Sequence, residues 1–190
     1  MATPAPAPSL RRAFFLRAVN VSGTNLVRMA DLRADLEAVG FGGVESLLAS
    51  GNLIATPPGA PEPGRRLVEE VLARRLGRRA AVVMFSQMEL ERLLSAVPDG
   101  PPPGAKHFVG LTGEEPSSEG WQRLLAVDGR GDTVTALPRG VLLACFAGQA
   151  ETVYTTDKLE RTLGVPVTAR NLNTLNKVLA KLGQGQAAPT

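Results

Sequence analysis

The order of hydrophobic and polar positions predicts a regular alternation of strands and helices along the chain. Short apolar runs are typical of buried strands, and apolar residues three or four positions apart are typical of amphipathic helices. In the first half, this pattern predicts strands at 13–21, 44–49, 53–56 and 80–85. It also predicts helices at 29–39 and 65–76, and a third helix that follows Ser86 and reaches Val97.

A segment rich in proline and glycine interrupts this pattern. Residues 98–104 read PDGPPPG, which is typical of a linker. The same order of elements then starts again, with strands predicted at 106–111, 133–137, 141–146 and 167–170 and helices at 117–127, 157–163 and 174–182. The resulting organisation is a disordered arm over 1–11, a first half over 12–97, a linker over 98–105, a second half over 106–183 and a disordered tail over 184–190.

Each half therefore has the order strand, helix, strand, strand, helix, strand, followed by one more helix. We predict an α+β protein made of two tandem ferredoxin-like (βαββαβ) halves, each followed by an extra helix. One face of each sheet then needs a cover other than its own two helices, and the other half is the natural cover. A cleft between two such halves is a common place for a ligand site.

Local residues predict several turns and helix ends. Pro138-Arg139-Gly140 is typical of a hairpin. Ser50-Gly51-Asn52 is typical of a tight turn or a bulge, because glycine and asparagine tolerate a positive φ. The side chains predicted to cap helix N-termini are Ser86 with Glu89, Ser117, Asp157 with Glu160, and Asn173 or Thr174.

Charge and composition narrow the classes of function. The formal net charge of +3 is small for a nucleic-acid-binding protein. The densest basic cluster, residues 65–79, places arginines and glutamates four positions apart, which favours a salt-bridged helix face. A single cysteine and a single histidine exclude a disulfide framework and a multi-histidine metal centre. Cys145 lies in an apolar run and is interpreted as a buried, unreactive thiol.

The expected compartment is the cytoplasm. The first eight residues alternate alanine and proline and lack the order of a signal peptide. No stretch approaches the roughly 20 apolar residues that a membrane-spanning helix needs. We therefore expect no membrane association.

Polar residues at the exit of the first strand are the first candidates for ligand binding. Arg17 lies in an apolar strand, where a charge is costly without a partner. Asn20 and Asn25 follow in a polar turn before a helix, which can hold an anion through backbone N–H groups. The alternative is that Asn20, Ser22 and Asn25 hydrogen-bond the backbone of their own loop.

A second group of candidates lies between the last strand and the last helix. Arg170, Asn171, Asn173 and Thr174 offer more polar groups than one helix cap needs, so either a polar ligand or plain capping explains them. Two further candidates are Asn52, in the turn described above, and Lys158, which could contribute a positive charge or be a solvated lysine.

His107 is a weak candidate for a catalytic residue. A histidine that titrates near neutrality can act as a general base, although a single histidine in a strand is more often structural. The sequence contains no Walker-type phosphate loop and no dinucleotide-binding fingerprint, so we expect neither a cofactor nor a metal.

Four segments together resemble a bacterial family called domain of unknown function 1697. They are FFLRAVNVSG at 14–23, MADLR at 29–33, SGN at 50–52 and TARNLNT at 168–174. The resemblance covers about residues 12–183 and implies two ferredoxin-like halves, but no established activity. The chain has Ala18 and Ser22 where the family usually has glycine, and Leu172 where it usually has tryptophan. We interpret these departures as a sign of a specialised member recruited to a dedicated pathway, in which Leu172 borders an apolar part of the ligand.

Three hypotheses for the function follow. The first is a cofactor-independent enzyme or small-molecule-binding protein with a polar or anionic ligand between the halves. The second is a nucleic-acid-binding module, which is disfavoured because only 4% of the residues are aromatic and stacking platforms are scarce. The third is a non-catalytic interaction protein whose motifs serve only folding. The oligomeric state stays open.

Overall fold

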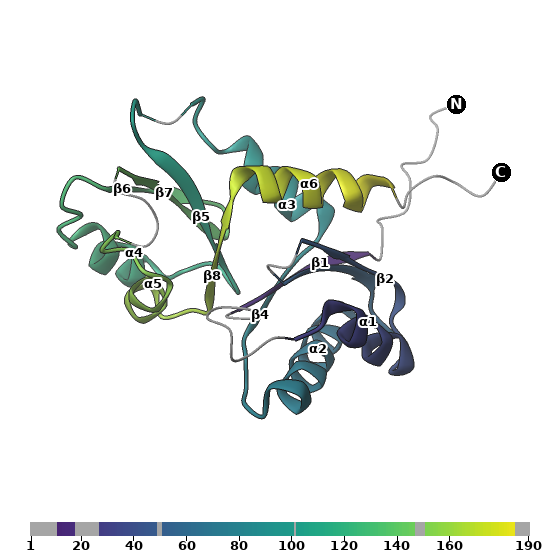
Figure 1. Ribbon diagram of the computed structural model, residues 1–190. Helices are drawn as coiled ribbons and strands as arrows, with labels where there is room; N and C mark the ends of the chain where they lie inside the picture. The colour runs from purple at the N-terminus through teal and green to yellow at the C-terminus, as the bar shows by residue number, and fades with distance from the viewer. Residues whose placement is uncertain (1–10, 18–26, 49–50, 101, 147–150, 185–190) are drawn as a thin grey trace, which may run out of the picture.

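The structure is a computed structural model that describes residues 11–17, 27–48, 51–100, 102–146 and 151–184. The predicted arm and tail lie almost wholly outside these ranges. Within them the chain forms a first unit, then an extra helix, then a second unit and a second extra helix (Figure 1).

In the described ranges, eight strands form two four-stranded antiparallel sheets. The first unit comprises β1 (Arg12–Leu16), α1 (Met29–Ala38), β2 (Gly42–Leu47), β3 (Asn52–Thr56), α2 (Pro61–Leu76) and β4 (Val82–Phe85), followed by the extra helix α3 (Gln87–Ser95). The second unit comprises β5 (Lys106–Thr112), α4 (Ser118–Leu125), β6 (Thr133–Leu137), β7 (Gly140–Cys145), α5 (Thr156–Leu163) and β8 (Val167–Asn171), followed by the extra helix α6 (Leu172–Gly183). The prediction of a mixed α+β fold is confirmed.

The strand order is the same in both sheets. It is β2-β3-β1-β4 in the first and β6-β7-β5-β8 in the second, so the first strand of each unit lies between the third and the fourth. Backbone hydrogen bonds repeat as well. Leu16 N–H donates to the Gly51 carbonyl at 2.8 Å, and Thr112 N–H donates to the Arg139 carbonyl at 3.0 Å. This correspondence identifies equivalent positions in the two units.

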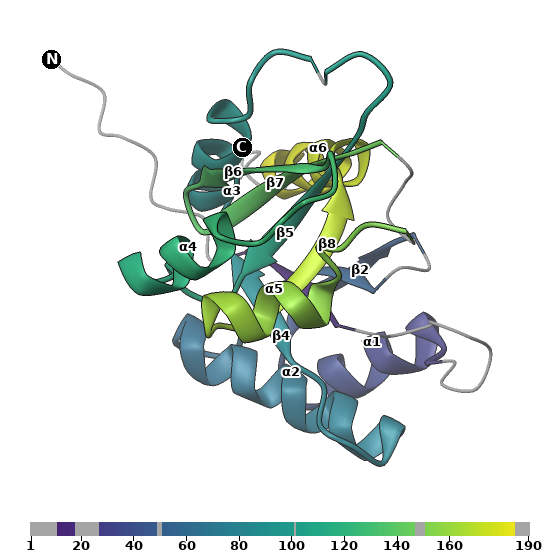
Figure 2. The same ribbon diagram turned by 90° about the vertical axis from the view of Figure 1, so that its left-hand side faces the viewer.

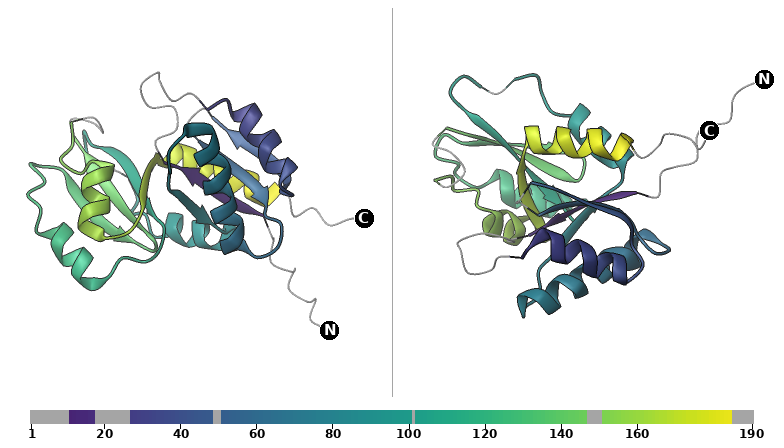
Figure 3. Two further views of the ribbon diagram at one scale, coloured as in Figure 1. Left: turned by 90° about the horizontal axis from the view of Figure 1, so that it is seen from below. Right: turned by 45° about the vertical axis from the view of Figure 1, so that its right-hand side comes forward.

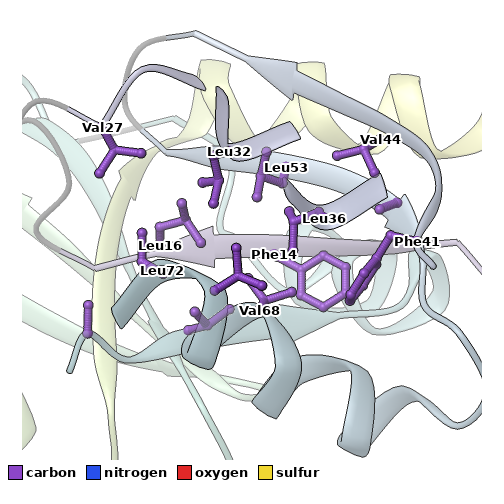
Figure 4. Packing of buried hydrophobic residues seen from close by; sticks show 14 residues of the cluster. Phe14, Leu16, Val27, Leu32, Leu36, Phe41, Val44, Leu53, Val68 and Leu72 are labelled. Atoms are coloured by element: carbon purple, nitrogen blue, oxygen red, sulfur yellow. The ribbon is translucent and has the colours of Figure 1, made fainter. Parts of the chain in front are cut away.

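Each sheet is covered on its outer face by the two helices of its own unit. In the first unit, α1 and α2 bury Leu32, Leu36, Val68 and Leu72 against Phe14 of β1 (Figure 4). In the second unit, α4 and α5 cover the other sheet in the same way. Figure 3 shows α1 and α2 at one end of the molecule and α4 and α5 at the other.

The inner faces of the two sheets and the two extra helices share one central core. It joins Phe15 of β1 and Val109 of β5 to Leu90 of α3 and Leu175 of α6. Helices α3 and α6 pack side by side there, as Figures 1 and 2 show. The predicted packing of one half against the other is therefore present, with the extra helices between the sheets.

Several predicted boundaries need correction. Helix α2 begins at Pro61 rather than at 65, because proline is tolerated in the first turn, where its missing N–H has no partner to lose. The cap of α5 is Thr155 rather than Asp157, and the cap of α6 is Asn171 rather than Asn173 or Thr174. The capping box of Ser86 with Glu89 and the Ser117 cap are confirmed.

In the described part of the chain, no helix combines the length and the apolar character that crossing a bilayer requires.

Candidate functional site

Arg170, the strongest sequence candidate, joins the end of β8 to the first unit. Its Nε donates to Asn52 Oδ1 at 2.6 Å, and its Nη2 donates to the carbonyls of Leu16 at 2.9 Å and Gly51 at 3.2 Å. Its Nη1 donates to Thr168 Oγ1 at 2.9 Å and to the neighbouring carbonyl of residue 169 at 2.8 Å. We call this contact the Arg170 junction.

The Arg170 junction occupies the donors of the guanidinium. Arginine has five N–H groups, and five acceptors within the protein receive them. Burial lowers the pKa of Arg170 to about 10, so the side chain remains protonated at neutral pH. The geometry therefore favours a structural role for Arg170 over the predicted contact with a ligand.

Asn52 and Arg17 also connect the two units. The Asn52 side chain is fully buried, and its Nδ2 donates to the Leu47 carbonyl at 3.0 Å while its Oδ1 accepts from Arg170. Arg17 follows β1 and forms ion pairs with Asp157 and Glu160 of α5. The partner that the charge of Arg17 requires thus comes from the other unit.

The remaining sequence candidates that the structure describes cap a helix, pack against the core or lie at the surface. Asn171 Oδ1 accepts from the N–H of Thr174 at 2.8 Å, which caps α6. Leu172 packs against the central core, Asn173 is exposed, and Lys158 is half-buried near the start of α5. Asn20 and Asn25, with the departures Ala18 and Ser22, lie outside the described residues.

A second arginine, Arg139, joins the hairpin between β6 and β7 to the first unit. Its Nη1 donates to Glu89 Oε1 of α3 at 2.6 Å. Its Nη2 donates to the carbonyls of Met84 at 3.0 Å, Thr112 at 3.2 Å and Gly113 at 2.7 Å. Its guanidinium carbon lies 4.4 Å from the centre of the Phe85 ring. We call this contact the Arg139 junction.

Glu89 is held in its ionised form at this junction. Burial raises the pKa of Glu89, but hydrogen bonds from the backbone and hydroxyl of Ser86 and the charge of Arg139 outweigh burial. The pKa of Glu89 therefore lies below its ordinary value. The same carboxylate thus caps α3 and binds the opposite unit.

Arg139 and Glu89 line two cavities, one between α3 and the second unit and the other between the first and second units. The larger has a volume of about 620 Å³. Its lining is Glu89 and Arg92 of α3, Glu115, and Ala136, Leu137, Pro138 and Arg139 of the β6–β7 hairpin. The smaller has a volume of about 320 Å³ and is lined in part by Arg12, Arg65 and Met84.

Two further sequence candidates can be placed. His107 is the second residue of β5, is half-buried and lines a third cavity of about 370 Å³ next to the linker. Cys145 is fully buried, and this burial raises the pKa of its thiol. A thiol that resists ionisation is a poor nucleophile, in agreement with the sequence analysis.

Sequence reasoning missed Arg139. The motif Pro138-Arg139-Gly140 predicted the hairpin, but no role was assigned to Arg139. Arg139 has a φ of +52°, a conformation that turns usually give to glycine or asparagine. The signal in the sequence was an arginine in the two-residue turn of a hairpin. Because arginine strains the backbone there, its side chain is expected to make contacts that compensate for the strain.

Comparisons with known proteins agree with the fold. A model of the family described as Protein of unknown function (DUF1697) matches residues 10–141. A solved structure, that of the conserved bacterial protein SP0830 from Streptococcus pneumoniae, has a TM-score of 0.73 and 23% sequence identity. The likeness covers 90% of this chain and 98% of that chain, and it shows the fold alone. Among curated proteins, no sequence matches.

Proposed function

We propose that this chain, which belongs to the family Protein of unknown function (DUF1697), binds a small anionic molecule between its two units. The observation that carries the proposal is the cavity of about 620 Å³ beside the Arg139 junction. Its volume lies in the range of roughly 300–1,000 Å³ that is typical of ligand pockets. Helix α3, which follows the first unit, and the second unit form its wall, as expected for a ligand site between the two halves of the chain.

The chemistry of the cavity suits a molecule with an anionic and an apolar part. Leu137 and Pro138 supply apolar surface, and Arg92 supplies an exposed guanidinium. Among the described residues, Arg92 pairs with no carboxylate, so its charge is available to a carboxylate or phosphate. Oε2 of Glu115 accepts a hydrogen bond from the backbone N–H of Arg139 at 2.8 Å. The other carboxylate oxygen of Glu115 can accept from a donor on the ligand.

The Arg170 junction supports placing the ligand beside Arg139 rather than beside Arg170. A ligand on that side would have to displace hydrogen bonds that hold the units together, and each buried acceptor left without a donor costs about 1–3 kcal/mol. In the cavity beside Arg139, a ligand can bind Arg92 without breaking an ion pair, since Arg92 forms none with the described residues. Binding beside Arg139 is therefore the less costly arrangement.

We propose a finer description of the fold together with this function. The strand order and chain order of each unit support the tandem ferredoxin-like arrangement predicted from the sequence. The cytoplasmic location and a cofactor-independent reaction stay predictions from the sequence.

The proposal is tested by thermal unfolding in the presence of a library of carboxylates, phosphates, nucleotides and apolar metabolites. A ligand at 100 times its dissociation constant adds about 2.7 kcal/mol of stability, which raises Tm measurably. We expect a carboxylate or phosphate to stabilise the protein, and Arg92→Ala to abolish the effect.

Arg66→Ala is the matched control. Arg66 is also an exposed helical arginine, but it lies on α2 and does not line the cavity. The variant should unfold at a temperature close to that of the wild type and keep the response to the ligand. No stabilising anion in the library, or one whose effect persists in Arg92→Ala, would overturn the proposed function.

A further inference from the structure

The inner face of the second sheet changes from apolar to polar along its strands. Strand register places three residues in each row across β5, β7 and β6. The first row is Leu111, Gly140 and Leu137, the second is Val109, Leu142 and Thr135, and the third is His107, Ala144 and Thr133. These residues share one face because side chains alternate along a strand. Polarity therefore increases with distance from the first row.

Helix α3 covers only the apolar end of this face. Leu93 of α3 packs over Gly140, where an added Cβ would lie 2.9 Å from Leu93 Cδ1. The helix ends at Ser95, and the chain continues into the linker. Thr133 and Thr135 are exposed beyond the helix, on the same face as the core residue Leu137.

The linker turns this uncovered end into a pocket. The cavity of about 370 Å³ has a floor of His107, Thr133, Thr135, Leu142 and Ala144, and a wall of Pro98, Asp99, Gly100 and Pro102. Apolar surface comes from both floor and wall, and two hydroxyl groups and an imidazole converge on it. Apolar lining with a few convergent polar groups is the usual composition of a small-molecule site.

We propose that this pocket is a second binding site, for a small uncharged molecule that joins an apolar ring to a hydroxyl or amide group. The ring packs on Leu142, Ala144 and the prolines, and the polar group exchanges hydrogen bonds with Thr135 and His107. Among the described residues that line the pocket, Asp99 is the one with a fixed charge, and it disfavours an anion. The site is separate from the cavity beside Arg139 and does not depend on the function proposed there.

His107 gives a direct measurement, because it is the only histidine of the chain. Its imidazole proton resonances can be followed by NMR during titration with benzyl alcohol and with benzoate, which share a ring and differ in charge. We expect benzyl alcohol to shift these resonances saturably and at lower concentration than benzoate. Thr135→Val keeps the shape of the side chain and removes the hydroxyl, so the apparent Kd should rise about fivefold.

Two control variants separate this site from other effects. Thr56→Val makes the same change at the end of β3 in the other sheet and should leave the titration unchanged. Arg92→Ala should leave it unchanged as well, even though it abolishes binding under the proposed function. The inference fails if benzyl alcohol gives no saturable shift, if Thr135→Val and Thr56→Val respond alike, or if benzoate binds more tightly than benzyl alcohol.

Discussion

Each of the two junctions contains one arginine of the second unit. Arg139 lies in the hairpin between β6 and β7, and Arg170 lies near the end of β8. By register, Arg139 of the second unit is equivalent to Gly51 of the first, and Arg170 is equivalent to Phe85. At one junction the hairpin supplies the arginine and the fourth strand supplies a ring; at the other the fourth strand supplies the arginine and the hairpin a carbonyl. Both junctions therefore join a hairpin of one unit to the fourth strand of the other. The arginine belongs to the hairpin at one junction and to the fourth strand at the other.

The environments of the two arginines differ as well. The acceptors that surround Arg170 are an amide, a hydroxyl and carbonyls, whereas Arg139 also meets the carboxylate of Glu89. Both arginines lie near aromatic rings, at 5.8 Å from the centre of Phe15 and 4.4 Å from that of Phe85. The two rings meet edge to face at 6.1 Å in the central core. The comparison indicates that hydrogen bonds dominate one junction and charge contributes more to the other.

The largest effect is expected for Arg170→Ala. It removes the guanidinium that donates to Asn52 Oδ1 and to the carbonyls of Leu16 and Gly51, and we expect a loss of about 4 kcal/mol in the free energy of unfolding. Arg170→Lys should recover only part of this, because one ammonium cannot reach acceptors on three segments. Urea unfolding measures both variants. A loss of less than about 1 kcal/mol for Arg170→Ala would contradict the role assigned to this junction.

Arg139→Ala should cost less, about 2 kcal/mol, because the Glu89 carboxylate that it leaves is half-exposed and can be solvated by water. Part of this loss comes from the ion pair with Glu89, so the difference between wild type and variant should shrink as salt is added. The Arg170→Ala difference should change little with salt. Equal salt dependence of the two differences, measured by urea unfolding at low and high ionic strength, would remove the distinction between the junctions.

Acid should weaken the Arg139 junction through Glu89. Because the pKa of Glu89 is lowered in the folded protein, its contribution to stability is present above the ordinary value of 4.5 and is lost as the pH falls through the folded pKa. The carboxylate is half-exposed, so we expect less than about 1 kcal/mol. Glu89→Gln should flatten the fall of Tm below pH 4.5 relative to wild type. An unchanged acid profile would show that Glu89 is not held ionised.

The smallest effect is expected for Arg17→Ala. Its ion pairs with Asp157 and Glu160 lie at the surface, where such pairs contribute about 0.2–1 kcal/mol. Arg75→Ala is a control, because Arg75 pairs with Asp35 and Asp31 within the first unit alone. Thermal unfolding should show similar small shifts for both. A loss for Arg17→Ala as large as that for Arg170→Ala would make Arg17 a third junction.

Much of the fold could be predicted because it depends on local pattern. Strand β6 was placed at 133–137 without error, and the Ser86 capping box was identified from two residues. Errors occurred where more than one residue could satisfy the same N–H group, as at the caps of α5 and α6. Sequence alone does not show which of several neighbouring polar residues is the cap, because this depends on the residue at which the helix begins.

The site was harder to predict, for a different physical reason. Arg170 and Asn52 were predicted to contact a ligand, whereas in the structure they contact each other, across 118 positions of the chain. A polar side chain that binds a ligand and one that binds a distant segment follow the same rules of hydrogen bonding. Arg92 and the Arg139 cavity escaped notice because the cavity exists only once both units are assembled.

The position of α6 sets the order in which the protein can be completed during synthesis. The first sheet is whole once Phe85 has left the ribosome, but α6, which packs against β1 and β3, spans residues 172–183. Until residues 172–183 emerge, Ala13, Phe15 and Ile54 lack the helix that buries them. The nascent first unit therefore presents an apolar surface from the emergence of Phe85 until that of α6, although its own strands and helices are already complete.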